Sequence, residues 1–217
     1  MIGPSSSHTA GAARLGMVAG RLFGGRPSSA VITLHGSFAM TGHGHGTDKA
    51  LVAGILGLMP DDERIKESLK LAEAAGLSVL FKTAYIRDAH PNTVNIELSN
   101  DVKCLSVTGS SIGGGNIIVT SIDGLNVEFT GQYNTLIIEH KDTPGVVAAV
   151  SGLLAADHIN IASMRMYRSH LGGKSIMILE TDTETSNLLQ DEIGAMDSIY
   201  RVTTLRPIKE GASNAGN

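Results

Sequence analysis

Histidine, serine and threonine gather in glycine-rich segments of the first half of this chain, and these residue types can do acid–base and binding chemistry. The central segment, residues 35–48, holds His35, His43 and His45 among glycines and ends on Thr47 and Asp48. Imidazole titrates near neutral pH and acts as a general acid, a general base or a metal ligand. The segment predicts a catalytic or substrate-binding loop, with a surface loop as one alternative. A metal site is the other alternative, although no acidic or thiolate residues stand at metal-ligand spacing.

Hydroxyl side chains also precede the first expected helix. This opening segment contains Ser5, Ser6, Ser7, His8 and Thr9. The free N–H groups and the dipole of a helix start favour a carboxylate or phosphate, so the segment suits binding of an anionic group. Serine and threonine are also favoured helix caps, and a polar cap is the structural alternative.

Two further loops can each be interpreted either as a ligand-binding loop or as a purely structural connection. Residues 108–116 include Gly113 and Gly114 and are expected to form either an anion-binding nest or a flexible hairpin. Residues 140–146 join a strand to a helix that Asp142 or Thr143 can cap. The cap explains most of that segment, and a ligand loop at the helix start is the functional reading.

Periodicity places these segments on a mixed α+β domain followed by a ferredoxin-like domain. The first domain is expected to contain three helices: one over 9–23, one from Thr47 to before Pro60, and one that begins after Asp61 or Asp62. The third helix is expected to bury Ile65, Leu69 and Ala72. Strands are expected over 30–34, 94–98, 117–119 and 125–129. The second has strands near 135–139, 159–166, 174–179 and 200–205, one helix burying Val146, Val150, Leu153 and Leu154, and another burying Leu188, Leu189 and Ile193. The expected order is therefore βαββαβ, with two helices on one face of the sheet.

The expected domain limits are 1–131 and 132–208, with a disordered tail over 209–217. The chain has 217 residues and a formal net charge of −4, which makes a nucleic-acid-binding role a poor candidate. No apolar run is long enough to span a membrane, and no basic-then-apolar leader opens the chain, so a cytosolic protein is expected. Cys104 is the single cysteine, and its apolar neighbours predict a buried thiol. One cysteine excludes an iron–sulfur cluster built wholly from this chain.

Taken together, three segments closely resemble the β subunit of bacterial iron–sulfur L-serine dehydratases. They are Gly-Pro-Ser-Ser-Ser-His-Thr at residues 3–9, the histidine-rich segment ending in Gly-His-Gly-Thr-Asp at residue 48, and Ser-Ile-Gly-Gly-Gly at residues 111–115. The second domain resembles an ACT domain, and Asp142, Pro144 and Gly145 match the ligand loop of that family. The resemblance covers residues 1 to about 208.

The resemblance implies an enzyme that converts L-serine to pyruvate and ammonia without pyridoxal phosphate. It implies a [4Fe–4S] cluster held by cysteines of a separate α subunit, so that this chain is half of an enzyme. It also implies a first domain similar to the allosteric substrate-binding domain of some phosphoglycerate dehydrogenases, and a homodimer formed through the ACT domain.

The resemblance also implies roles for single residues. His45, at the histidine of the Gly-His motif, is expected to transfer a proton or orient the substrate, and His8 is the second catalytic candidate. The expected substrate-binding residues are Ser5, Ser6, Ser7, Thr9, Thr47, Asp48, Gly113 and Gly114. His43 stands where other members have lysine, and His35 where a relative has tyrosine, so both are weaker candidates.

Two other classes of function fit the same domains. A purely regulatory amino-acid-binding module would need no chemistry, but it would have little use for exposed imidazoles. A structural assembly subunit for the cluster-bearing partner is the third reading.

Overall fold

The structure, a computed structural model, describes residues 7–41 and 46–207, the side chains of Ser7 and Thr41 excepted. The chain divides into two compact units, Met1–Thr130 and Gly131–Asn217. Both units combine helices with a sheet, which confirms the predicted α+β class. No helix in the described ranges is long and apolar enough to cross a membrane.

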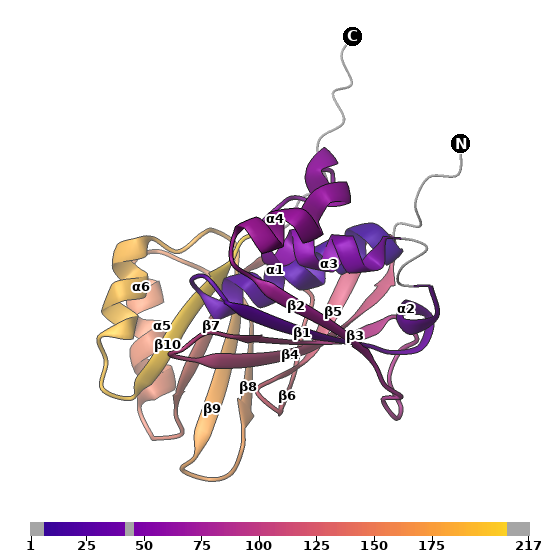
Figure 1. Cartoon of the computed structure of the whole chain (residues 1–217). Coiled ribbons are helices and arrows are strands. Elements are labelled where there is room, and N and C mark those ends of the chain that lie inside the picture. Colours follow the sequence, from indigo (N-terminus) through magenta and orange to yellow (C-terminus); the bar gives the residue numbers. More distant parts are fainter. Residues whose placement is uncertain (1–6, 42–45, 208–217) are drawn as a thin grey trace. The chain divides into compact units, whose positions relative to one another are not determined.

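The first unit is a six-stranded sheet with its main helices on one face (Figure 1). Its elements are η1 (Ser7–Gly11), α1 (Ala12–Phe23), β1 (Ser29–Leu34), α2 (Gly36–Thr41), α3 (Thr47–Ile55), η2 (Glu63–Glu67), α4 (Ser68–Ala74), β2 (Ser78–Thr83), β3 (Thr93–Ser99), β4 (Cys104–Gly113), β5 (Asn116–Ile122) and β6 (Leu125–Phe129). The strand order is β2-β1-β3-β4-β5-β6, parallel only between β1 and β2. Alternation along the strands directs one apolar side chain in two toward α1 and α3.

Glycine allows α1 and α3 to approach closely. A methyl group on Gly54 would lie 2.0 Å from the carbonyl oxygen of Ala13, and one on Gly16 would lie 2.1 Å from that of Leu51. Such distances are far below van der Waals contact, so only glycine fits at these two positions. The crossing holds the turn that precedes α1 against the beginning of α3, and both carry predicted site residues.

Several predicted helix boundaries in the first unit are wrong. The helix expected over 9–23 begins as a π-helical turn, and α1 proper starts at Ala12. The residue that caps α3 is Gly46, at φ 72°, while Thr47 and Asp48 belong to the helix itself. Leu69, expected in the core, is exposed because the third helix is split into η2 and the short α4.

The second unit has the predicted βαββαβ order, which confirms the expectation from periodicity. Its elements are β7 (Asn134–Lys141), α5 (Val146–Ala156), β8 (Ile161–Arg168), β9 (Lys174–Thr181), α6 (Asn187–Gly194) and β10 (Ile199–Leu205). The strands pair antiparallel in the order β10-β7-β9-β8, and both helices lie on one face (Figure 1). The core contains Leu136, Ile138, Val146, Val150, Leu154, Met177, Leu179, Leu189, Ile193 and Ile199, with Leu153 packed against it.

Two side-chain predictions for the second unit are wrong. Leu188 is 78% exposed, because the buried face of α6 passes through Leu189 and Ile193 instead. Neither Asp142 nor Thr143 caps α5; its cap residue is Gly145, in the left-handed region at φ 92°. A glycine in that conformation begins the helix without a side-chain acceptor.

Candidate functional site

The π-helical turn η1 places the first predicted catalytic side chain. His8 lies on this turn, and its Nε2 is 3.1 Å from Ser37 Oγ on α2. The imidazole also packs edge-on against the Phe38 ring, with centroids 5.5 Å apart. π-Helical turns are rare in proteins, and those that do occur are often located at functional sites. These two contacts orient the His8 ring in a partly buried position.

Two buried hydroxyl groups stand on the elements that meet at this turn. Thr9 Oγ1 and Thr47 Oγ1 are buried and have no hydrogen-bond partner among the described residues. Thr47 is the first residue of α3, which packs against η1. A buried hydroxyl without a partner costs about 1–3 kcal/mol. Two of them on adjoining elements indicate a place where ligand atoms complete the hydrogen bonding.

Asp48 supplies a buried carboxylate beside these hydroxyls. Its side chain lies in the first turn of α3, where the helix dipole favours negative charge. The backbone N–H of Lys49 donates to Asp48 Oδ1 at 2.8 Å. A carboxylate is a suitable partner for an ammonium group.

The glycine-rich turn between β4 and β5 lies against the same helix start. Gly113, Gly114 and Gly115 all have positive φ, and Arg14 Nη1 donates to the Gly115 carbonyl oxygen at 2.8 Å. A methyl group on Gly115 would be 3.4 Å from Ala10 Cβ. β4 continues to Gly113, so the part of the predicted loop before this turn is strand. The structure thus joins the first and third predicted segments.

These groups are chemically suited to a small zwitterion with a hydroxyl group. Threonine hydroxyls donate to a carboxylate, Asp48 accepts from an ammonium group, and His8 can hold or move a proton. All of them come from the first unit and surround the beginnings of α1 and α3.

Comparison with known proteins assigns the chain to a family. The model of the serine dehydratase beta chain matches residues 1–121, and the model of the ACT domain matches residues 134–196. The probable L-serine dehydratase beta chain of Bacillus subtilis is 40% identical over 205 residues, covering 94% of this chain and 93% of the relative. The chain belongs to the serine dehydratase beta chain family. The sequence-based recognition of this family is thereby confirmed.

Two other relatives show how widely the domain pair occurs. The L-serine dehydratase beta chain of Peptoniphilus asaccharolyticus is 41% identical and covers 96% of this chain and 94% of the relative. A D-3-phosphoglycerate dehydrogenase of Synechocystis is 27% identical over 88% of this chain but only 35% of its own length. Both domains of the serine dehydratase beta chain thus resemble a portion of a larger enzyme with another name.

The structure describes only part of the predicted site of this beta-chain family member. Ser5, Ser6, His43 and His45 lie outside the described residues, and the Ser7 side chain is likewise not described. His8, Thr9, Thr47, Asp48 and the turn holding Gly113 and Gly114 are gathered in the first unit, as set out above. Arg14 was not among the residues predicted from the sequence. A lone arginine among alanine and leucine at the start of a helix was the available signal.

The contacts of His35 hold neighbouring segments of the fold together. It is buried at the end of β1, and its Nδ1 accepts the Ile86 backbone N–H at 3.0 Å. It also packs edge-on against Tyr85. These contacts tie the segment after β2 to β1, and they engage the ring with the backbone.

The residues present do not fit an iron–sulfur cluster. Cys104, the only thiol, is exposed at the start of β4, so the prediction of a buried thiol is wrong. Among the described residues no three histidine, cysteine or acidic side chains are close enough to hold a metal ion. Protein-bound clusters require several thiolates, so this chain cannot ligate one by itself.

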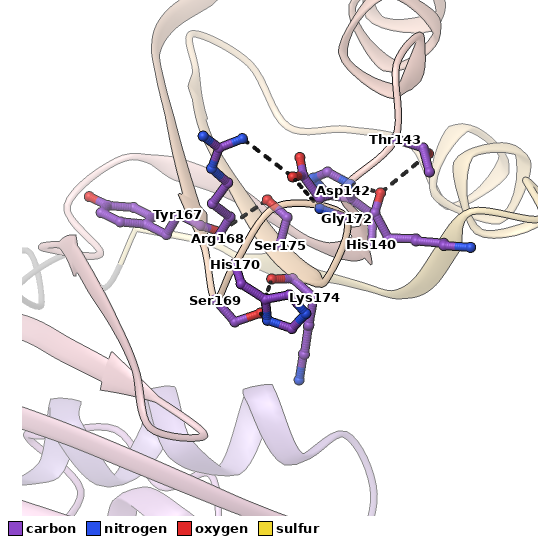
Figure 2. Close-up of polar contacts among 11 residues, drawn as sticks. His140, Asp142, Thr143, Tyr167, Arg168, Ser169, His170, Gly172, Lys174 and Ser175 are labelled. Atoms are coloured by element: carbon purple, nitrogen blue, oxygen red, sulfur yellow. Dashed lines mark hydrogen bonds and ion pairs between the residues drawn. The ribbon is translucent and has the colours of Figure 1, made fainter.

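The predicted ligand loop of the ACT domain is held by contacts to the β8–β9 turn (Figure 2). Asp142 Oδ2 accepts the Gly172 backbone N–H at 3.1 Å and is 3.4 Å from Arg168 Nη1. Thr143 Oγ1 donates to the Lys141 carbonyl oxygen at 3.4 Å. The following helix α5 has no side-chain cap and no acidic residue in its first turn. Asp142 therefore organises the loop.

Replacing Asp142 with alanine is expected to loosen the β8–β9 turn. The Gly172 N–H loses its acceptor, and Arg168 loses a half-exposed ion pair worth little by itself. We expect faster amide hydrogen exchange over residues 168–174 and a loss of stability of about 1 kcal/mol. Hydrogen-exchange mass spectrometry and denaturant unfolding measure the two effects. Thr143→Ala is the control, since it removes only a long exposed contact. Equal exchange in both variants would contradict the assignment.

Proposed function

We propose that this chain is the β subunit of a two-chain L-serine dehydratase, which acts with an α subunit to convert L-serine to pyruvate and ammonia. The observation that carries the proposal is the similarity to two named L-serine dehydratase beta chains over more than nine-tenths of every chain. The oxygen-lined, carboxylate-bearing site of the first unit supports it, because L-serine carries a carboxylate, an ammonium group and a hydroxyl group.

The proposed reaction removes water from L-serine. The α-proton leaves to a base, the hydroxyl group leaves as water, and 2-aminoacrylate remains. This product takes up water and decays to pyruvate and ammonia. In the proposed site, Thr9 and Thr47 donate to the substrate carboxylate, together with Ser5, Ser6 and Ser7. Asp48 supports His45 or takes the ammonium group. His45 and His8 are the proposed proton-transfer or substrate-orienting residues.

A separate α subunit is part of this proposal. Because this chain has a single exposed cysteine, we propose that cysteines of the α subunit hold the [4Fe–4S] cluster implied by the resemblance. The chemistry of this chain is then limited to binding, orientation and proton transfer, with neither pyridoxal phosphate nor a metal ligand of its own. We further propose that the ACT domain pairs with a second copy of itself.

A regulatory amino-acid-binding subunit is the second candidate. The similarity of both domains to a phosphoglycerate dehydrogenase favours it, since related domains there accompany an enzyme of different name. Under this reading the site would bind an amino acid without chemistry.

Reconstitution separates the two candidates. The chain, the proposed α subunit and their mixture are each treated anaerobically with iron and sulfide, and pyruvate formation from L-serine is measured. The proposal expects activity only in the mixture. Activity of the α subunit alone, modulated by this chain, would favour the regulatory candidate. Pyruvate formation by this chain alone would contradict both.

A further inference from the structure

Two buried polar atoms near η1 belong to residues for which the sequence predicts no individual role, although Ser111 opens the Ser-Ile-Gly-Gly-Gly segment. Asn92 Oδ1 and Ser111 Oγ are buried, and neither has a hydrogen-bond partner among the described residues. Ser111 has no exposed surface at all. Asn92 directly precedes β3, and the N–H of Ser111 on β4 donates to its carbonyl oxygen at 3.0 Å. Two unsatisfied oxygens on hydrogen-bonded neighbouring residues call for a ligand group that donates hydrogen bonds.

Both residues adjoin the turn that carries His8 and Thr9. A methyl group on Gly11 would lie 2.0 Å from Ser111 Oγ, so this hydroxyl is against the last residue of η1. On the other side, the Ser37 N–H donates to the carbonyl oxygen of Pro91, next to Asn92, at 2.7 Å. Ser37 is also the partner of His8. Contacts thus connect both ends of η1 to the Asn92–Ser111 pair.

The orientation of the Asn92 amide leaves an acceptor unused. Its Nδ2 donates to the Ser111 carbonyl oxygen at 3.5 Å, which directs Oδ1 away from that carbonyl. Oδ1 can only accept hydrogen bonds, whereas Ser111 Oγ can accept or donate. An ammonium group has three N–H donors and matches several adjacent oxygens better than a single hydroxyl donor does.

We propose that Asn92 Oδ1 and Ser111 Oγ bind the α-ammonium group of the substrate amino acid, which leaves Asp48 to support His45. This inference rests on the proposed function for the identity of the substrate. Asn92 and Ser111 are binding residues with no part in proton transfer. They determine that the site accepts an amino acid in preference to a simple hydroxy acid.

Ser111→Ala and Ser110→Ala form a matched pair for the test. Ser110 Oγ is 2.7 Å from Thr93 Oγ1 and buried, so its hydroxyl has a structural partner that Ser111 Oγ lacks. Removing an unsatisfied buried hydroxyl does not destabilise a fold, whereas removing a satisfied one does. Ser110→Ala is therefore expected to lower the Tm of the full chain by about 2–4 °C. Ser111→Ala should leave the Tm unchanged or raise it.

Binding to the anaerobic two-chain complex is measured by calorimetry with two unreactive ligands. L-Alanine keeps the ammonium group and lacks the hydroxyl, while 3-hydroxypropionate keeps the hydroxyl and lacks the ammonium group. Ser111→Ala and Asn92→Ala are expected to weaken L-alanine binding about tenfold or more and to change 3-hydroxypropionate binding less than twofold. Ser110→Ala should change neither affinity.

The outcomes separate this inference from the proposed function. Equal L-alanine affinity in the parent and in Ser111→Ala would overturn the inference, and so would a loss confined to 3-hydroxypropionate. If the complex forms no pyruvate but L-alanine binding still depends on Ser111, the inference stands and the proposed function fails. Calorimetry needs no turnover, so it reports on binding in either case.

Discussion

Replacing His45 with alanine is expected to lower pyruvate formation by the reconstituted two-chain enzyme by roughly 10²–10⁴-fold. His45 stands two residues before Thr47, the first residue of α3, which brings a buried hydroxyl and the Asp48 carboxylate into the site. An imidazole this close in sequence to these groups can exchange a proton with the substrate. The loss should fall mainly on kcat, because a proton-transfer group acts in the transition state.

His43→Ala is the matched control for this experiment. It removes an imidazole from the same loop, two residues earlier, at a position where the resemblance indicates that lysine occurs in other members. We expect a loss of less than about tenfold from this variant. Comparable α-subunit binding by both variants, checked by gel filtration, shows that assembly is intact. If His45→Ala keeps kcat and KM near those of the parent, the catalytic assignment of His45 is wrong.

Replacing Gly54 with alanine is expected to destabilise the first unit by at least about 2 kcal/mol. The added methyl group would meet the Ala13 carbonyl oxygen at 2.0 Å and the Met17 backbone nitrogen at 2.7 Å. Both are backbone atoms inside α1, so the clash can be relieved only by moving one helix away from the other. Since α1 follows η1, the same movement displaces His8 and Thr9 from Thr47.

Gly152→Ala is the matched control and is expected to stabilise the chain. Gly152 lies on α5 of the second unit, is exposed, and has open space where the methyl group would be placed. Alanine is favoured over glycine in a helix interior by about 1 kcal/mol, so this variant should be more stable than the parent. Denaturant unfolding measures both variants, and hydrogen exchange assigns each change to its unit. Destabilisation of equal size in both variants would show that the close approach of α1 and α3 is not the cause of the stability loss in Gly54→Ala.

Local patterns predicted most of the elements because burial imposes its period on the sequence. The strands β3 and β6 alternate between core and solvent, and the order of elements in the second unit follows from the same signal. Predictions of helix starts were poorer. Thr47 and Asp142 have the side chains of good caps, yet Gly46 and Gly145 occupy the cap positions with positive φ. A backbone conformation selected by the whole fold decided those positions.

Exposure of single apolar residues was also beyond the reach of periodicity. Leu188 and Leu189 are adjacent residues of the same type, but only Leu189 is buried in the core. Cys104 alternates with apolar neighbours and is nevertheless exposed at the start of a strand. Periodicity does not say which face of a helix or strand is buried, because that is set by what packs against it.

The sequence alone determined the α+β class, the βαββαβ order of the second unit and, through its short motifs, the family. It also determined that one cysteine cannot hold a cluster, since counting thiols needs no coordinates. Only the tertiary structure joined Arg14 to Gly115, a contact between residues 101 positions apart. Only it showed that Asn92 Oδ1 and Ser111 Oγ lack partners, because a buried atom is known to be unsatisfied only after every neighbouring segment has been placed around it.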